Sequence, residues 1–441
     1  MNWTHLLASQ RTGQKVLPTE QYRSAFEQDY DRIIFSHPFR RLQDKTQVHP
    51  LPEHDFVHTR LTHSLEVSSV GRSLGKRVGE VILSRYPDLQ KNFSLFDFGA
   101  IVAAASLAHD LGNPPFGHAG EDAISDFFGL HPQGQYFKDK VEDECWSDLL
   151  KFEGNAQGFR ILNKNQFGLK LTYATLGAFT KYPCTSHFPS RDKRRRSQKK
   201  YGFFQTEKNI FGEVARELNL ITQSPNGWCR HPLAFLVEAA DDICYSIIDL
   251  EDGCSLGLVS YAEAQGLFES VITKSKSKLG KLDTLGSQAE KIGYLRALAI
   301  ADLMDECTNL FLDNEKNILE GIFDQALCDE CESKNALKQI IKISVEKIYC
   351  ARNVVEIEAA GHEVLPGLLD EFTKAGIHLM QKKASRKYAN LQKLLPQQVE
   401  QAIKHEPENY YHMLRNMVDF ISGMTDRHAI SVYRKIKGMS L

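Results

Sequence analysis

The chain has 441 residues, of which 42% are hydrophobic and 25% are charged, and its formal net charge is −2. These values are ordinary for a globular protein with a large core, and they exclude a chain built mainly to coat nucleic acid. No apolar run reaches the roughly 18–20 residues of a membrane-spanning helix, so we expect no membrane partner.

The nine cysteines are an odd number and are spread along the chain. Scattered thiols in a long chain are typical of a reducing compartment. Cys328 and Cys331 form one CxxC pair, and a structural zinc site would need a second pair with that spacing. The first residues lack the basic region that precedes the apolar stretch of a signal peptide. We therefore expect a cytoplasmic protein with free thiols.

The first strong helical pattern covers Leu61–Leu83, where apolar residues recur at helical spacing. Arg60 and His63 stand three residues apart at its start, so on a helix they share one face. A single histidine in such a place is more often structural than a ligand. The pattern alone therefore makes His63 a candidate only.

The next helical segment, Phe96–Ala108, is almost wholly apolar or small and leads into the pair His109-Asp110. This composition predicts a helix packed on most sides. A strand would point the two side chains of the pair to opposite faces, whereas on a helix they are about 100° apart. They can meet at one ion only if other buried helices supply the remaining ligands.

A turn follows the pair. Pro114 and Pro115 are expected to end the first helix, and Gly117 allows a tight turn. His118 then opens the next helix, with Glu121 one turn along. A histidine and a glutamate at this spacing form a plausible proton-handling pair, although such pairs are also common on exposed helices.

Two further segments are predicted to be loops. His131–Tyr136 contains proline and glycine, and Pro183–Tyr201 contains the mostly charged run Arg191–Lys200. We expect the longer loop to be exposed and mobile. A charge run of this kind is usually a solvated surface, and the alternative is a contact with single-stranded nucleic acid.

The pattern of Pro232–Leu250 predicts an apolar helix with Asp241 and Asp242 at its centre. Carboxylates are rarely buried unless they are paired, hydrogen-bonded or bound to a metal. Together with His63 and the pair His109-Asp110, a carboxylate from this helix would complete a set of two imidazoles and two carboxylates. Such a set suits a hard or borderline divalent cation with open positions for water and substrate.

The rest of the chain also favours helices. Ala289–Leu312 has a strong helical pattern, and Thr425 is a helix N-cap followed by an acidic first turn. The fold class is therefore all-α, with small β-hairpins as decoration. A soft boundary near Gly253–Gly257 divides an N-terminal region and core, residues 1–255, from a helical C-terminal lobe, residues 256–441, packed on that core.

Six longer stretches carry a more specific signal. They are Arg23–Ser36, Phe39–Val48, His58–Val67, His109–His118, Phe152–Gly158 and Glu238–Asp249. In this order they resemble the HD superfamily of metal-dependent phosphohydrolases and, within it, the deoxynucleoside triphosphate (dNTP) triphosphohydrolases, the dGTPase-like proteins. The resemblance covers about residues 20–255 and is far more specific than a single His-Asp pair. It implies an HD-domain helical core.

The resemblance implies a metal site. It assigns the ligands to His63, His109, Asp110 and Asp241. The choice of Asp241 over Asp242 follows the family pattern, which has a tyrosine four and an aspartate eight residues after the ligand; here these are Tyr245 and Asp249. Mn²⁺ or Mg²⁺ is the expected metal, and Fe²⁺, Ni²⁺ and Zn²⁺ also suit such ligands.

The resemblance also implies a substrate site. It assigns contacts to Gln47, Arg60, Asn155, Lys181, Tyr182, Tyr245, Asp249 and Arg352. Arg60 would hold a phosphate oxygen beside the metal. Lys181 and Tyr182 would contact the polyphosphate. Tyr245 would leave no room for a ribose 2′-hydroxyl, and Asp249 would accept a hydrogen bond from the 3′-hydroxyl.

The implied reaction is hydrolysis of a dNTP to a deoxynucleoside and inorganic triphosphate. His118, oriented by Glu121, would take the proton from a water that attacks the α-phosphorus. The general acid is unassigned, because Glu153–Gly158 lacks the histidine that some relatives carry there. Asn113 also stands where some relatives have a substrate-facing histidine.

The resemblance further implies a homo-oligomer, a tetramer or a hexamer, with a dNTP as effector as well as substrate. Two alternatives differ from the leading hypothesis. The first is an HD phosphohydrolase for another nucleotide, such as a nucleoside monophosphate or a cyclic dinucleotide. The second is a nucleotide-regulated protein that binds single-stranded DNA through the basic run Arg191–Lys200.

Overall fold

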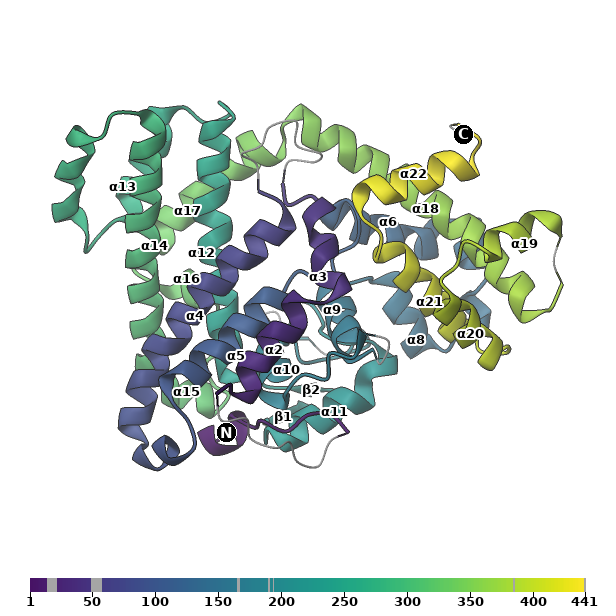
Figure 1. Ribbon diagram of the computed structural model, residues 1–441, viewed down its shortest axis with the longest axis horizontal. Helices are drawn as coiled ribbons and strands as arrows, with labels where there is room; N and C mark the ends of the chain where they lie inside the picture. Colours follow the sequence, from purple (N-terminus) through teal and green to yellow (C-terminus); the bar gives the residue numbers. More distant parts are fainter. Residues whose placement is uncertain are drawn as a thin grey trace.

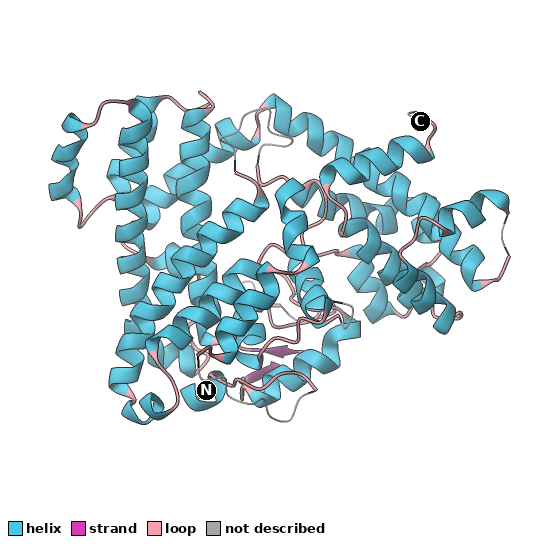
Figure 2. Ribbon diagram, in the orientation of Figure 1, coloured by secondary structure: helices cyan, strands magenta, loops and turns pink. Residues whose placement is uncertain are grey.

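The computed structural model describes residues 1–13, 22–48, 58–164, 167–188, 191–192, 194–383 and 385–439. These residues form a helical protein (Figures 1 and 2), which confirms the all-α class. Strands β1 (Thr222–Ser224) and β2 (Gly227–Trp228) pair in a small antiparallel hairpin, the kind of decoration that was expected.

The α-helices are α1 (Trp3–Leu6), α2 (Ala25–Ile34), α3 (His37–Arg41), α4 (Arg60–Arg85), α5 (Leu95–Ala108), α6 (Gly117–Leu130), α7 (Pro132–Gln135), α8 (Asp143–Leu150), α9 (Gly154–Asn163), α10 (Tyr173–Phe179), α11 (Lys208–Glu217), α12 (Pro232–Ser255), α13 (Tyr261–Val271), α14 (Gln288–Asp313), α15 (Glu315–Leu319), α16 (Leu327–Glu330), α17 (Lys334–Ile343), α18 (Arg352–Met380), α19 (Arg386–Gln392), α20 (Gln397–His405), α21 (Tyr410–Ser422) and α22 (Asp426–Ile436).

The strongest helical patterns all form helices, namely α4, α5, α12, α14 and α22. The expectation of a loop at His131–Tyr136 was wrong, because α7 lies there. Pro132 stands at the first turn of α7, where a proline costs no hydrogen bond, and the side chain of His131 accepts from the Gln133 amide at 3.2 Å. This proline begins a helix where we expected it to prevent one.

Helices α4 and α5 pack closely along a row of glycines on α4. A Cβ added to Gly75 would lie 2.7 Å from the Phe98 carbonyl oxygen, and one added to Gly79 would lie 2.8 Å from the Phe98 side chain. Gly71 faces Ser106 in the same way, at 2.5 Å from its hydroxyl. Because these positions lack side chains, the two backbones approach closely, and the start of α4 comes to lie beside the end of α5.

Helix α12 packs against both α4 and α5, and most of its residues are buried. Its N-terminus begins with Pro232 and is capped by His231, whose Nδ1 accepts from the Leu233 amide at 3.0 Å. Figure 1 shows α12 running beside α4, with α5 next to them. Helices α4, α5 and α12 form the scaffold on which the candidate metal ligands stand.

The buried apolar side chains form two clusters. The first joins the α4–α5–α12 scaffold to α13, α14 and α17. The second joins α6 and α8 to the C-terminal helices α18 and α21. The clusters do not divide at residue 255, so the division into 1–255 and 256–441 stays a prediction about how the chain is organised.

All nine cysteines are free thiols, including Cys328 and Cys331 of the CxxC pair, which are buried. Cys328 lies with its sulfur 3.8 Å from that of Cys307 and packs in the first apolar cluster. Within the described residues, none of the helices combines the length and hydropathy that crossing a lipid bilayer requires.

Candidate metal centre and active site

The His109-Asp110 pair lies at the end of α5. His109 is the C-cap of this helix, and Asp110 follows in a turn. The Nδ1 atom of His109 lies 2.7 Å from the Ser106 carbonyl oxygen. As an N–H group it donates there, and this fixes the tautomer in which Nε2 keeps a free lone pair. The pair converges because α5 ends at Ala108, so the 100° separation that a continuous helix would impose on the two side chains does not apply.

The turn after the pair is held from two sides. The buried ammonium group of Lys45 donates to the Asn113 carbonyl oxygen at 2.5 Å and to the Ser422 carbonyl oxygen at 2.9 Å. The Phe116 amide donates to Asp426 at 3.2 Å. Phe116 and Gly117 both have positive φ angles, 66° and 57°, and this tight turn leads into α6.

Gly112→Ala should break this turn. A Cβ at Gly112 would lie 1.9 Å from the Gly154 carbonyl oxygen and 2.1 Å from the Gly158 nitrogen, both in the backbone of α9. We expect thermal or urea unfolding to show a loss of at least about 2 kcal/mol, because the backbone of α9 has to move.

The matched control is Gly293→Ala in α14, where an added Cβ meets nothing within 4 Å. That substitution should stabilise the protein by about 0.5–1 kcal/mol, because alanine is the better helix former. Equal effects of the two substitutions would contradict the close approach of the turn and α9.

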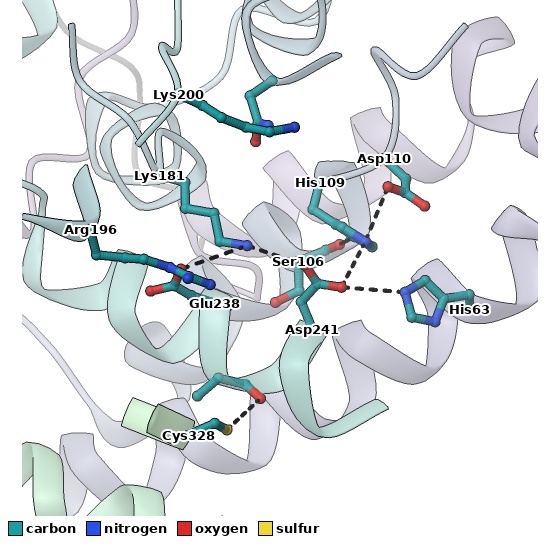
Figure 3. Close-up of polar contacts among 12 residues, drawn as sticks. His63, Ser106, His109, Asp110, Lys181, Arg196, Lys200, Glu238, Asp241 and Cys328 are labelled. Atoms are coloured by element: carbon teal, nitrogen blue, oxygen red, sulfur yellow. Dashed lines mark hydrogen bonds and ion pairs between the residues drawn. The ribbon is translucent and has the colours of Figure 1, made fainter. Parts of the chain in front are cut away.

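The four expected metal ligands meet at the junction of α4, α5 and α12 (Figure 3). The ligand atoms of His63, His109 and Asp110 all lie within 4.8 Å of one another. Asp241 completes the group, with Oδ1 3.4 Å from Nε2 of His63 and 3.5 Å from Nε2 of His109. The Nε2 atom of His109 is also 3.4 Å from Oδ1 of Asp110. Residues 178 positions apart along the chain therefore face one point.

The charges of this group fit a cation. Burial works against charge on Asp110, but His109 and Arg60 hold its pKa at about 2. Burial opposes charge on Asp241 as well, yet His109 and Lys181 keep its pKa well below the usual value. Both carboxylates are thus ionised at neutral pH.

His63 provides a further test of whether the group fits a metal. Its Nε2 atom is buried and makes no well-aligned hydrogen bond among the described residues, although Oδ1 of Asp241 lies 3.4 Å away. A buried polar atom without a partner costs about 1–3 kcal/mol. A divalent metal ion fits this group, because two imidazole nitrogens and two carboxylates face one point. The metal would also supply a partner for the buried Nε2 atom of His63.

Two neighbours orient Asp110, one of the expected metal ligands. The buried guanidinium of Arg60 lies with Nη1 2.8 Å from Oδ2 of Asp110, and Asn113 donates to Oδ1 at 2.5 Å. The Nε of Arg60 is buried and unpaired among the described groups. Arg60 thus supports the ligand and lies beside the cluster, where it could also contact an anion.

The cluster opens into a cavity of about 560 Å³. The expected site residues in its wall are Gln47, Arg60, His63, His109, Asp110, His118, Glu121, Asn155, Lys181, Tyr182, Asp241 and Tyr245. Asp249 and Arg352 are not in the wall. The amide oxygen of Gln47 is buried and without a partner among the described groups, which leaves it able to accept from a ligand.

His118 stands in the first turn of α6 and is exposed to the cavity. Its desolvation, together with the nearby charges of Lys200 and Arg60, lowers its pKa below the usual value. The imidazole is therefore neutral at pH 7 and can accept a proton.

The structure does not join Glu121 to His118. Within the described residues, no hydrogen bond or ion pair links the two side chains. Oε1 of Glu121 instead accepts from the Gly154 amide at 2.6 Å, and Oε2 lies 3.8 Å from Nζ of Lys200. Burial and the nearby Glu153 raise the pKa of Glu121 to about 7. That Glu121 orients His118 stays a prediction.

One wall of the cavity is aromatic. Tyr245 on α12 packs against Tyr349, with ring centroids 5.7 Å apart. Tyr349 ends a π-helical turn, Ser344–Tyr349, a rare element that often marks functional sites. The Tyr349 hydroxyl donates to Asp249 at 2.6 Å, and burial raises the pKa of Asp249 to about 7. Asp249 therefore lies behind the tyrosines, one turn beyond Tyr245.

Lys181 lies between α12 and the cavity. Its ammonium group is 3.3 Å from Oδ2 of Asp241 and 3.9 Å from Oε1 of Glu238, as Figure 3 shows. Tyr182 follows it in the wall. The ammonium group of Lys181 pairs with Asp241 and also lines the cavity, so it can face an anionic ligand there.

Arg352 lies outside the cavity. Its side chain is 93% exposed and its guanidinium pairs with Glu356, one turn along α18, at 2.7 Å. The structure of one chain does not bring Arg352 to the other site residues, and its role as a substrate contact stays a prediction.

The expectation that the run Arg191–Lys200 is exposed was wrong for most of its described part, although Arg194 and Lys199 are exposed; that the run is mobile stays a prediction. Arg196 pairs with the fully buried Glu238 at 2.9 Å, and Ser197 is buried. Lys200 pairs with Glu153 at 3.2 Å. Acidic residues on α12 and elsewhere draw these cations inward, and composition alone could not reveal those partners.

Several wall residues were not assigned a site role from the sequence. They are Asn113, Glu153, Arg196, Lys199, Lys200, Asp242, Tyr349, Val354, Ile357 and Glu358. The basic run contained a signal, since three of its cations line the cavity. The residues from Tyr349 to Glu358 gave none, because they lie more than 90 positions beyond the end of α12.

Comparisons with known proteins agree with this geometry. The sequence profile of the HD domain matches residues 60–151, and that of the phosphohydrolase-associated domain matches residues 329–435. A deoxyguanosinetriphosphate triphosphohydrolase-like protein of Synechocystis is 45% identical, with an alignment that covers the whole of both chains. A protein of the same description from Pseudomonas aeruginosa is 38% identical over this whole chain and 99% of its own.

A deoxyguanosinetriphosphate triphosphohydrolase of Salmonella paratyphi A is 32% identical over 97% of this chain and 96% of its own. These relatives match nearly the whole chain, and the profile matches include His63, His109 and Asp110 of the cluster and the C-terminal helices. The chain thus belongs to the HD-domain phosphohydrolases, in the family of the deoxyguanosinetriphosphate triphosphohydrolase-like proteins.

Proposed function

We propose that this protein is a metal-dependent dNTP triphosphohydrolase that releases a deoxynucleoside and inorganic triphosphate. The observation that carries the proposal is one cavity that joins a cation-binding cluster, a neutral imidazole and several cationic side chains. The names of the relatives agree with it, since the Salmonella protein is called a deoxyguanosinetriphosphate triphosphohydrolase.

In this proposal His63, His109, Asp110 and Asp241 hold the divalent metal, with Mn²⁺ or Mg²⁺ as the expected ion. The bound metal would neutralise charge on a phosphate oxygen and lower the pKa of water. Arg60 binds the same phosphate, because its guanidinium lies beside Asp110.

His118 acts as the general base of the reaction. Its neutral imidazole takes a proton from the water that attacks the α-phosphorus, and the bond from phosphorus to the 5′-oxygen breaks. The electron pair of that bond stays on the 5′-oxygen, which leaves as the hydroxyl of the deoxynucleoside once it is protonated.

The remaining wall residues orient the substrate. Lys181 and Tyr182 face the polyphosphate, where an ammonium group and a phenol can donate to phosphate oxygens. Tyr245 packs against the sugar, and the tyrosine pair leaves no space for a 2′-hydroxyl. Asp249 supports this wall through its hydrogen bond with Tyr349, which uses one carboxylate oxygen, and the other oxygen would accept from the 3′-hydroxyl.

The test is an analysis of products. The protein, loaded in turn with Mn²⁺, Mg²⁺, Fe²⁺, Ni²⁺ or Zn²⁺, is incubated with each dNTP and with GTP. We expect deoxynucleoside and triphosphate in equal amounts from at least one dNTP, and little turnover of GTP. Release of pyrophosphate and a nucleoside monophosphate would contradict the proposal, because the α–β bridge would then be the bond that breaks.

A further inference from the structure

The basic segment Arg194–Lys200 forms part of the cavity wall through three cations, Arg196, Lys199 and Lys200. This segment contains only one short 3-10 turn, Arg196–Gln198, so its own hydrogen bonds cannot fix its position. All seven of its residues carry polar or charged side chains that water would solvate readily. Its place at the cavity therefore depends on contacts with other parts of the chain.

Asp324 makes four of those contacts. This buried residue lies in the loop before α16, far along the chain from the segment. Its carboxylate accepts from the Ser197 hydroxyl at 2.6 Å and from the Ser197 amide at 3.3 Å. It also pairs with Nε of Arg195 at 3.1 Å, and its carbonyl oxygen accepts from the Arg196 amide at 2.9 Å.

The anchor is itself held rigidly. Arg230, whose side chain is fully buried, places Nε 2.9 Å from Asp324 and Nη1 2.5 Å from Glu238. Glu238 on α12 pairs in turn with Arg196 at 2.9 Å. Figure 3 shows Arg196 and Glu238 beside Lys181, with His63 on the other side of Asp241. A buried ion network thus ties the segment to the helix that carries Asp241.

The anchored segment presents its cations at the phosphate side of the site. Lys200 lies near Glu121 and Glu153, and Lys199 is exposed in the same wall. If the segment were released, both ammonium groups would gain freedom, and holding an anion would then cost the entropy of ordering them again.

We propose that Asp324 is a positioning residue for polyphosphate binding: it fixes the segment Arg194–Lys200 so that its lysines face the cavity. The inference rests on the proposed function for the identity of the anion. Asp324 itself touches neither the metal cluster nor the cavity, so its effect on the ligand acts through Ser197, Arg195 and Arg196.

The experiment measures binding of inorganic tripolyphosphate and of deoxyguanosine to the full-length, metal-loaded protein by calorimetry. The variants are Asp324→Asn, which removes the charge, and Ser197→Ala, which removes one hydrogen bond. Ser197→Ala leaves Asp324 in place as the partner of Arg230. Asp329→Asn is the matched control, because Asp329 meets Arg196 only at 3.8 Å and is 54% exposed.

We expect the Kd of tripolyphosphate to rise about tenfold in Asp324→Asn and about threefold in Ser197→Ala, as the loss of a charged and of a neutral hydrogen bond implies. The Kd of deoxyguanosine and the effect of Asp329→Asn should stay near the wild-type value. Should Asp324→Asn fail to fold, Ser197→Ala decides the question.

An unchanged Kd of tripolyphosphate in the folded variants, with or without a lower melting temperature, would make Asp324 merely structural and overturn the inference. An equal rise for both ligands, an equal effect of Asp329→Asn, or no binding of tripolyphosphate to the wild type would also overturn it. The proposed function fails on a different observation, the absence of triphosphate among the products of wild-type turnover.

Discussion

Asp241→Asn should remove the bound metal and slow dNTP hydrolysis by more than about 100-fold, since even residues that only support a metal ligand account for 10–100-fold. The reason is geometric: Oδ1 of Asp241 lies 3.4–3.5 Å from both imidazoles of the cluster. An asparagine keeps the shape of the side chain and loses the negative charge that a divalent cation requires. Metal content by elemental analysis and turnover with added Mn²⁺ measure the two effects.

Asp242→Asn is the matched control, one position along the same helix. Burial beside Glu238 raises the pKa of Asp242 to about 7, so near neutral pH its carboxyl is partly protonated and an amide is a close substitute. The bound metal should remain. If Asp242→Asn lost the metal and Asp241→Asn kept it, the assignment of the fourth ligand would be reversed.

His118→Ala should lower kcat by about 10²–10⁴-fold while the metal stays bound, the usual range for loss of a general base. The variant keeps all four residues of the cluster, so its metal content should equal that of the wild type. A loss of metal together with activity would show that His118 supports the cluster and would remove it from the proposed chemistry.

The pH dependence follows from the same imidazole. Its pKa lies below the usual value of about 6.5 because of burial and the charges of Lys200 and Arg60. A protonated imidazole cannot accept a proton, so kcat/KM should fall only as the pH drops through this lowered pKa. An acid limb above pH 7 would contradict the role of His118 as the base of the free enzyme.

Glu121→Gln separates two views of His118. Because Glu121 bonds to the Gly154 amide and not to His118, this substitution should cost less activity than His118→Ala. Equal losses in the two variants would support the dyad that the sequence suggested, and would require Glu121 to turn toward His118 when substrate binds.

The sequence was sufficient for those parts of the fold that depend on local pattern. Helices α4, α5 and α12 follow from apolar spacing, and the resemblance to the family selected side chains that meet in space. The pattern misjudged segments whose state depends on distant partners. The run Arg191–Lys200 looked like a solvated surface because Glu238 and Asp324, which hold it, are far from it in the sequence.

Only one of the two tyrosines in the aromatic wall of the cavity could be predicted from the sequence, for the same reason. Tyr245 was found because it lies on α12 at a fixed spacing from Asp241. Tyr349 was not found, because a residue in a π-helical turn a hundred positions later has no periodicity that links it to the site. Glu121 shows a different limit of the sequence pattern. Its spacing from His118 on one helix suggested a pair, but its side chain instead accepts from a backbone amide on α9.

The site draws on two separate portions of the polypeptide. Every candidate cation ligand lies between His63 and Asp241, whereas Tyr349, Ile357 and Glu358 reach the cavity from the region beyond α17. Under the proposed function, substitutions in that later region can alter which nucleoside is accepted and leave the proposed metal ligands and His118 unchanged. Selectivity and chemistry can therefore diverge independently among descendants of one ancestral chain.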